Sequence, residues 1–326
     1  MLQTLPLVLF IVMAEVSIGA VSVLVFLDWR NEVKRGFLVS YALIYLVLAG
    51  LTYWFQQSFS TPELLNTYAK LDKAWTGYLS LPLLLFFLLL IPYSFFLLLD
   101  KTAGVQDATS KDDQAVTEQK VARKSSPIRI LRLLSGVATV VAGLVTLFVM
   151  AMIYRPMAGS EIGGIITVAG FFAAAFALGG VLTAMWLGHW YLVTPALSER
   201  PLQFSTTLVL VAVAAQVLLF IVAGGNASDA GKAHPITPPP VTAQATPVPS
   251  NQVKPANAPV VTPLGTDAIG WIRVLVGYVM PLVLGGLSWK LIRDRSFQSA
   301  TGMLYLVVVC SLAGEIMSRG LFVGGL

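Results

Sequence analysis

Long apolar runs, separated by short clusters of charged residues, proline and glycine, follow one another along most of the chain. A run of about 20 apolar residues is long enough to cross the hydrocarbon core of a bilayer as an α-helix. Reading each run up to the cluster that interrupts it predicts eight spanning helices. They cover residues 4–27, 37–55, 76–99, 131–154, 162–192, 205–223, 268–289 and 299–318. The pattern therefore predicts an all-α integral membrane protein folded as an eight-helix transmembrane bundle.

Two polar segments divide the predicted helices. Residues 101–130 are polar and of mixed charge, which predicts a flexible cytoplasmic linker between a first bundle of three helices in 1–100 and helices four to six in 131–223. Residues 224–267 are rich in proline, alanine, threonine and valine, a composition typical of polyproline II and disorder. We expect a disordered outer loop there, followed by helices seven and eight in 268–326. A tolerated insertion is the plainer interpretation of this loop, and a docking arm for a partner is the alternative.

The composition agrees with a membrane protein and excludes several other classes. Of the 326 residues, 56 % are hydrophobic and only 11 % are charged, whereas soluble domains carry about 25 % charged residues. Cys310 is the one cysteine, which excludes a cysteine-cluster metal or iron–sulfur site. The two histidines, His189 and His234, are predicted on opposite sides of the membrane, so we expect no intrinsic haem. The net charge of +5 comes from basic residues that flank the spans, so no nucleic-acid partner is expected.

Lysine and arginine are distributed unequally between the two sets of loops. One set of alternate loops, with the helix ends beside them, carries fourteen of the 21 basic residues, and the other set carries seven. By the positive-inside rule the richer set is cytoplasmic. With an even number of spans, both termini are then expected on the outer (periplasmic) side of an inner (cytoplasmic) membrane.

Ionisable side chains within the spans are the first candidates for function, because a charge in the hydrocarbon core is costly unless it is paired or hydrated. Glu15 lies about 11 residues, or ~17 Å, into the first span, near the midplane. Its carboxyl group is either protonated, or faces a polar cavity or a cation from another helix. Glu315 and Arg319 are four residues apart, the spacing at which helical side chains meet, so a simple ion pair within the last helix is an alternative to a functional role.

Further polar residues lie at the predicted outer ends of the spans. Arg273 enters the seventh span, where snorkelling to the headgroups is the plain interpretation. Tyr154 and Arg155 end the fourth span, and Gln56 and Gln57 end the second. Polar and aromatic residues are common at any membrane interface, but only His189 offers comparable chemistry at the inner side.

Four stretches together resemble a known family. The sequence LAGEIMSRGLFVGG (312–325) is similar to the end of the last helix in the membrane anchor subunit of dimethyl sulfoxide reductase, which belongs with the polysulfide reductase and nitrite reductase membrane subunits. Residues 5–20, 148–180 and 271–278 fit the same family in the same order. The eight-span layout with both termini outside also resembles that anchor.

The resemblance implies a haem-free subunit that interacts with a quinone, either menaquinone or ubiquinone. Such subunits anchor an iron–sulfur electron-transfer subunit, which exchanges electrons with a molybdopterin catalytic subunit; here both would dock on the outer face. Residue by residue, the resemblance extends to Glu315, Arg319, Tyr154, Arg273 and Glu15, with glutamine in the family at the position of Glu15. The family's His-Leu-Gly-x-Pro stretch after the second span is replaced here by FQQSFSTPELL.

These observations lead to the hypothesis of a quinone site at the outer leaflet, with no bound metal. Glu15 and Glu315 are its expected catalytic residues. Its expected quinone-binding residues are Gln56, Gln57, Tyr154, Arg155, Arg273 and Arg319. His189 is a secondary candidate, although a histidine beside Trp190 and Tyr191 is typical of an interfacial anchor.

Two other classes of function remain open at the level of sequence. A secondary transporter would use Glu15 as its coupling carboxylate and would contain an inverted repeat with broken helices. A structural membrane scaffold would satisfy every buried polar group locally.

The predicted orientation is testable with reporter fusions. A fusion within 101–127 should report the cytoplasm, and a fusion within 226–265 should report the outside, measured by paired reporters that are active on one side only. The reverse pattern would invert the orientation and place the polar outer ends on the inner face.

Overall fold

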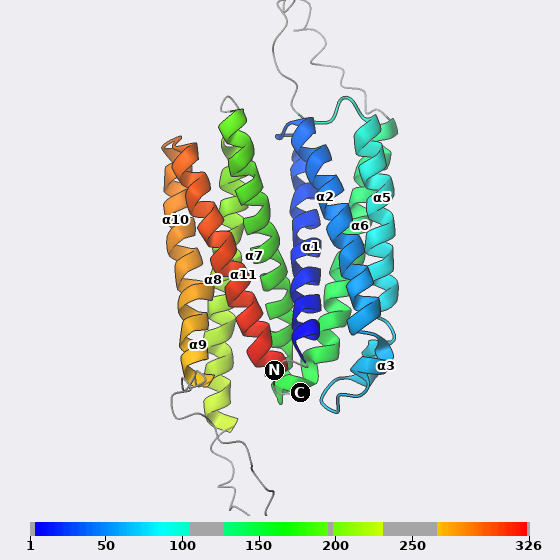
Figure 1. Ribbon diagram of the computed structural model, residues 1–326, viewed down its shortest axis with the longest axis vertical. Helices are drawn as coiled ribbons and strands as arrows, with labels where there is room; N and C mark the ends of the chain where they lie inside the picture. The colour runs from blue at the N-terminus through cyan, green and yellow to red at the C-terminus, as the bar shows by residue number, and fades with distance from the viewer. Residues whose placement is uncertain (1–3, 105–126, 195–197, 231–265, 325–326) are drawn as a thin grey trace, which may run out of the picture.

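The structure consists of long helices, eight of which are long and apolar enough to cross a membrane (Figure 1). The computed structural model describes residues 4–104, 127–194, 198–230 and 266–324, and this part of the chain contains no strand. The prediction of an all-helical protein with eight helices that could span a membrane is therefore confirmed for the described residues. The elements are α1 (Leu5–Arg30), α2 (Arg35–Phe59), α3 (Pro62–Leu65), α4 (Lys73–Thr76), α5 (Ser80–Leu99), α6 (Pro127–Tyr154), η1 (Arg155–Ala158), α7 (Glu161–Val193), α8 (Arg200–Ala230), α9 (Thr266–Val274), η2 (Leu275–Val279), α10 (Met280–Arg293) and α11 (Phe297–Val323).

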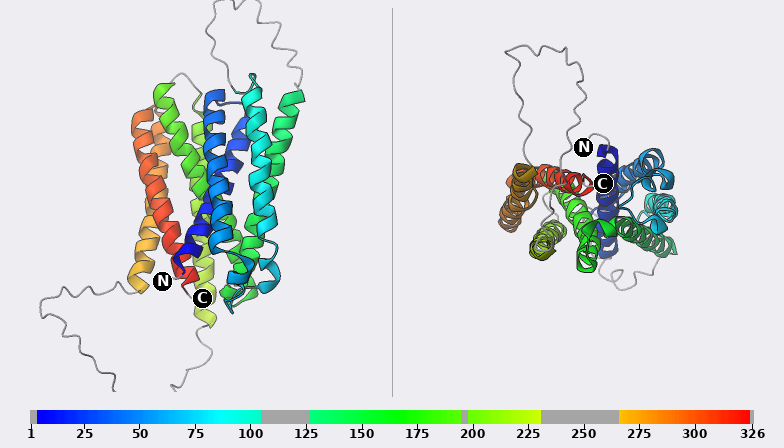
Figure 2. Two further views of the ribbon diagram at one scale, coloured as in Figure 1. Left: turned by 45° about the vertical axis from the view of Figure 1, so that its right-hand side comes forward. Right: turned by 90° about the horizontal axis from the view of Figure 1, so that it is seen from below.

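The long helices form two four-helix bundles that lie side by side (Figure 2). In the first bundle α1, α2, α5 and α6 contact one another in a ring, and in the second α7, α8, α10 and α11 do the same. The bundles meet where α1 contacts α7 and α11, and where α6 contacts α7. Both bundles begin with a helix that runs in the same direction, so the described helices form a parallel pair of bundles (Figure 1). This division at the connection between α6 and α7 differs from the expected three-helix first bundle.

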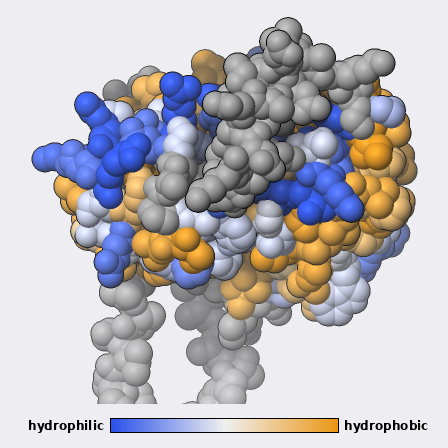
Figure 3. All heavy atoms as spheres, turned by 90° about the horizontal axis from the view of Figure 1, so that it is seen from above, coloured by the Kyte–Doolittle hydropathy of each residue, from blue (hydrophilic) through white to orange (hydrophobic). Residues whose placement is uncertain are grey.

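The two ends of the molecule differ in character. Leu5 and Val323 lie at one end, which we call the terminal end, together with α3 and α4 (Figure 1). At the opposite end hydrophilic residues gather over the helix ends, and hydrophobic residues surround them at the rim (Figure 3). Both termini lie at the same end of the helices (Figure 1).

Helix α1 is the central helix of the molecule. Its most apolar stretch is 83 % buried inside the protein, against 17–50 % for the other spans. A helix that is apolar on all sides needs to be surrounded by other helices or by lipid, and α1 contacts α2, α6, α7 and α11.

A close helix crossing joins the two bundles. A Cβ atom on Gly179 of α7 would overlap the backbone of Gly19 on α1, and a Cβ atom on Gly19 would overlap the carbonyl group of Ala175. Small residues let helix backbones approach closely in membranes, where van der Waals packing replaces the hydrophobic effect between helices. The glycines therefore set the distance between the bundles.

The boundaries differ from the expected ones at the two polar segments. Of the expected linker 101–130, residues 105–126 lie outside the described residues. The N–H of Gly104 donates a hydrogen bond to Oδ1 of Asn31 at 2.8 Å, and α6 already begins at Pro127. Of the expected loop 224–267, residues 231–265 lie outside the described residues, and α8 extends to Ala230. Apolar composition marks the part of a helix inside the membrane and misses the polar turns that continue it beyond.

Substitution of Gly179 by valine should separate the bundles. Because the added side chain meets backbone rather than a flexible side chain, the cost should reach about 3 kcal/mol or more. The expected result is a clear loss of thermal stability of the purified protein, followed by circular dichroism in detergent. Gly302→Val is the matched control, because a Cβ atom on Gly302 meets no atom within 4 Å; equal stability of the two variants would contradict the close crossing.

Candidate functional site

The centre of the candidate site is an ion-pair cluster that joins α1 to α11. The Arg319 guanidinium donates a hydrogen bond to the Glu15 carboxylate, although the two residues are 304 positions apart in sequence. Its Nε lies 2.8 Å from Oε1 of Glu315, one helical turn away. Exposure is 0 % for Glu15, 6 % for Glu315 and 7 % for Arg319, so the cluster is buried. Of the alternatives left open for Glu15, the structure places a cation from another helix beside it, Arg319. The ion pair within the last helix is also present.

Neighbouring side chains complete this cluster. Nε2 of Gln216, on α8, donates to Oε2 of Glu315 at 3.1 Å. The Arg319 guanidinium lies 4.0 Å from the centre of the Phe171 ring, a cation–π contact. Tyr154 stacks on the same Phe171 ring, and the two ring centres are 5.9 Å apart. Residues of α1, α6, α7, α8 and α11, from both bundles, thus meet at one point.

The charges in the cluster do not balance. One guanidinium faces two carboxyl groups, so a neutral cluster requires one proton shared between Glu15 and Glu315. Oε2 of Glu15 and the hydroxyl group of Tyr154 are buried without a hydrogen-bond partner among the described residues. The arrangement can therefore hold, accept and release a proton inside the membrane-spanning region.

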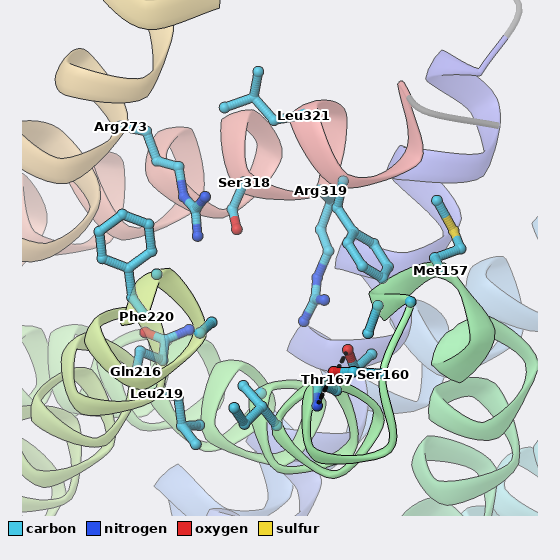
Figure 4. Close-up of a pocket in the computed structure, with 18 of the residues that line it drawn as sticks. Met157, Ser160, Thr167, Gln216, Leu219, Phe220, Arg273, Ser318, Arg319 and Leu321 are labelled. Atoms are coloured by element: carbon cyan, nitrogen blue, oxygen red, sulfur yellow. Dashed lines mark hydrogen bonds between the residues drawn. The ribbon is translucent and has the colours of Figure 1, made fainter. Parts of the chain in front are cut away.

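A cavity of about 680 Å³ opens beside the cluster, towards the terminal end. Arg319 and Gln216 form part of its wall, and α7, α8, α9 and α11 surround it (Figure 4). Most of the remaining lining is apolar, with Leu219, Phe220 and Leu321 among the residues that contribute. The cavity thus combines a largely apolar wall with a few polar groups, as binding sites for small organic molecules do.

The far wall of the cavity carries a second cation. Arg273 donates to the hydroxyl group of Tyr278 at 2.7 Å, and its guanidinium lies 5.1 Å from the ring centre of Phe220. Its side chain points into the cavity towards Phe220 rather than outward to headgroups (Figure 4). The π-helical turn η2 begins two residues after Arg273 and contains Tyr278. Such turns are frequent at functional sites. Gly277 in this turn packs directly on Gly314, which precedes Glu315.

The loop before α7 supplies the polar edge of the cavity. The Ser160 hydroxyl oxygen caps α7 by accepting a hydrogen bond from the N–H of Gly163 at 3.0 Å. Ser160 and Thr167 both line the cavity. Neither was predicted as a site residue, because a serine at a helix start and a threonine within an apolar helix are common everywhere.

Four expected site residues lie elsewhere. Gln56 donates to the Ser60 carbonyl group and to the Ser80 hydroxyl group, and its oxygen accepts from Gln57; neither glutamine lines the cavity. Arg155 packs against Gly164 outside the cavity. His189 is exposed near the end of α7 that is opposite to the terminal end, the position expected of an interfacial anchor.

A second buried ion-pair cluster, at the end opposite to the termini, was not predicted. Arg132 of α6 lies 2.7 Å from Asp100 and 3.1 Å from Asp28 of α1, and Tyr93 donates to Asp28 at 3.3 Å. Asp28, Asp100 and Arg132 look like ordinary residues at the ends of spans, so only their convergence in space reveals the cluster. None of these three charged residues lines the cavity beside Arg319, and we interpret the cluster as a structural link between α1, α5 and α6.

Asp100 lies just beyond the membrane-spanning part of α5. Its burial raises the pKa of its carboxyl group, but hydrogen bonds from the hydroxyl and N–H groups of Thr102 and the charge of Arg132 outweigh this effect, and the net pKa is below its ordinary value. Asp100 therefore stabilises the folded protein as a carboxylate, and its contribution is lost as the pH falls through the lowered pKa.

Removal of the central cation should destabilise the protein. In Arg319→Gln, Glu15 and Glu315 remain buried without a counter-charge, and breaking a buried ion pair costs about 3–5 kcal/mol. The double variant Glu15→Gln/Arg319→Gln removes both charges and should recover most of the thermal stability. Equal melting temperatures for the single and the double variant would show that the two residues do not interact.

Comparisons of the chain with models of protein families, with curated proteins and with solved structures find no match.

Proposed function

We propose that the chain is a haem-free, quinone-interacting membrane subunit of a multi-subunit oxidoreductase, resident in the inner membrane. In this proposal it passes electrons between the quinone pool and an iron–sulfur subunit that serves a molybdopterin catalytic subunit. The observation that carries the proposal is a largely apolar cavity of about 680 Å³ whose wall contains Arg319, the centre of a buried two-carboxylate cluster.

The cavity has the chemistry that a quinone needs. Phe220 and Leu219 offer apolar and aromatic contact for the ring, and the mostly apolar lining suits an isoprenoid tail. Two oxygens lie on opposite sides of a quinone ring, and the cavity has a guanidinium on either side, Arg273 on one and Arg319 on the other, with Gln216 beside Phe220 as a further donor (Figure 4). Charge-assisted hydrogen bonds from arginine also stabilise a negatively charged reduced ring.

Oxidation of a quinol releases two electrons and two protons, so the site needs proton acceptors. Glu315 and Glu15 are joined to the cavity wall through Arg319, which contacts both carboxylates. A proton that leaves the quinol can neutralise this cluster, which otherwise carries one excess negative charge. The electrons have no acceptor in the chemistry of the side chains, which include a single cysteine, and the proposal assigns them to the iron–sulfur partner on the outer face.

The two alternatives make different demands on the structure. An inverted-repeat transporter requires two halves of opposite direction, whereas the two described bundles run in the same direction. A structural scaffold requires no cavity and would satisfy every buried polar group locally. Oε2 of Glu15 and the hydroxyl group of Tyr154 instead have no hydrogen-bond partner among the described residues.

The proposal is tested by separating binding from proton transfer. Glu15→Gln and Glu315→Gln keep the shape of the side chain but remove the titratable site, so each should slow quinol oxidation by the assembled complex about a hundredfold, within the range of general acid–base groups. The binding of a short-chain quinone such as decylubiquinone or menadione to the purified chain should change little. Glu161→Gln is the matched control, because Glu161 is an exposed carboxylate at the same end of the molecule.

A steric variant tests the location of the bound ring. Gly170 lines the cavity, and a Cβ atom there meets no atom within 4 Å, so Gly170→Leu should fill the cavity without disturbing the helix and should abolish quinone binding. Gly302→Leu adds the same side chain outside the cavity and should bind quinone as the original protein does. Unchanged binding in Gly170→Leu, or unchanged turnover in both glutamate variants, would refute the proposal.

A further inference from the structure

A second cavity, an open groove, lies where the two bundles meet, on the half of the molecule away from the termini. It has a volume of about 350 Å³ and is lined by residues of α1, α6, α7 and α8. Ser22 supplies its one hydroxyl group, and that group already donates to the carbonyl group of Ile18 at 2.7 Å. The lining that remains is aliphatic and aromatic, including Phe26, Val141 and Phe204, so the cavity offers no specific polar contact to a bound head or ring.

The position of this groove relative to the membrane follows from its two ends along α1. Trp29 marks the end nearer to the membrane surface, with an exposure of 62 %, and an exposed tryptophan at a helix end is typical of the headgroup level. Ser22 lies seven residues further inside the span, or ~10 Å at the rise of an α-helix. One leaflet of the hydrocarbon core is about 15 Å thick, so the groove passes through most of one leaflet.

The size of the groove decides what fits it. A transmembrane helix is about 10 Å wide, so 10 Å of its length fills roughly 800 Å³, more than twice the volume of this groove. A lipid acyl chain is much thinner, is uniformly apolar and lies parallel to the helices. The groove therefore suits an acyl chain better than a helix of a partner subunit.

The mouth of the groove carries positive charge. The guanidinium of Arg30 lies 5.8 Å from the ring centre of Phe26 and 6.0 Å from that of Phe204, the two rings that line the groove at this level. Arg30 is paired with Glu32 at 2.8 Å, but the pair is exposed, and exposed pairs are weak enough to be replaced by another anion. Arg200 begins α8 one turn before Phe204 and is also exposed, so it adds a second positive charge at this end of the groove.

We propose that the groove between the bundles is a binding site for one anionic glycerophospholipid. One acyl chain lies in the groove from Phe26 towards Ser22, and the phosphate group lies beside Arg30 at the mouth. A lipid in this position contacts α1 and α6 of the first bundle and α7 and α8 of the second, so it binds the two bundles together. The site is separate from the cavity beside Arg319 and does not depend on its function.

The experiment measures the lipid that the purified chain retains. The protein is purified in detergent, mixed with equal amounts of dioleoyl phosphatidylglycerol and dioleoyl phosphatidylcholine, and examined by native mass spectrometry. We expect one phosphatidylglycerol to remain bound, with a preference of about tenfold over phosphatidylcholine, the size of effect that one charge-assisted contact supplies. Equal retention of the two lipids would overturn the anionic site.

Two variants with matched controls test the chain and the headgroup separately. Val141→Trp places a large ring in the groove and should abolish retention of either lipid, whereas Val283→Trp adds it to an equally exposed position on α10, at 54 % against 53 %, and should not. Arg30→Gln should remove the preference for phosphatidylglycerol. Arg293→Gln is its control, because Arg293 also lies on an aromatic ring, 5.0 Å from the centre of Trp289, but on α10, which does not line this groove.

The outcomes are distinct. Loss of lipid in Val141→Trp with loss of preference in Arg30→Gln supports the site as described. Retention in Val141→Trp equal to that in Val283→Trp overturns the position of the acyl chain. A preference in Arg30→Gln equal to that in Arg293→Gln overturns the position of the phosphate, and this second variant needs no change in the packed part of the groove.

Discussion

The cost of placing charge in the hydrocarbon core governs how this protein is put together. Arg319 and Glu15 are each expensive to bury alone, and only their contact makes both tolerable in the membrane-spanning region. Since Glu15 lies on the central helix α1 and Arg319 on the last helix, their contact fastens the two bundles where they also form the candidate site. Arg132 pairs in the same way with Asp28 and Asp100, at the end of α1 away from the termini and within the first bundle. The central helix is thus held by one cation near its middle and by another near one end.

Packing between the bundles adds a second constraint, which is geometric. The crossing at Gly19 and Gly179 brings α1 and α7 so close that no side chain fits between them. This contact lies one turn from Glu15, so the glycines also determine how far Arg319 has to reach across the interface. The cavity remains open because α8 and the π-helical turn η2 stand away from this crossing, while Gly277 and Gly314 keep η2 against α11.

Much of the fold can be predicted from the composition of the sequence and the spacing of its apolar runs. Hydrophobic runs predict the eight spans because the bilayer imposes a length and an apolar character on every crossing helix. The runs do not predict the grouping into two parallel bundles of four, because helices in a membrane choose their neighbours through small residues and shape, as at Gly179. In the site, Glu315 and Arg319 were predictable from their spacing, and Glu15 from its isolation in an apolar run. The contact among all three was not predictable, because Glu15 and Arg319 are 304 positions apart in sequence and no local pattern links them. Gln216 and the Asp28–Arg132–Asp100 cluster were missed for the same reason, and Gln56 and Gln57 were assigned to the site although their hydrogen bonds are satisfied within α2 and at α5.

The separation between Glu15 and Arg319 has a consequence for how the chain is made. Helix α1 is synthesised before α11, so Glu15 enters the membrane before the arginine that pairs with it has been made. Until α11 is inserted, a charged Glu15 in the hydrocarbon core is costly. A chain that ends before α11 therefore leaves the most buried helix with a carboxyl group that lacks this counter-charge.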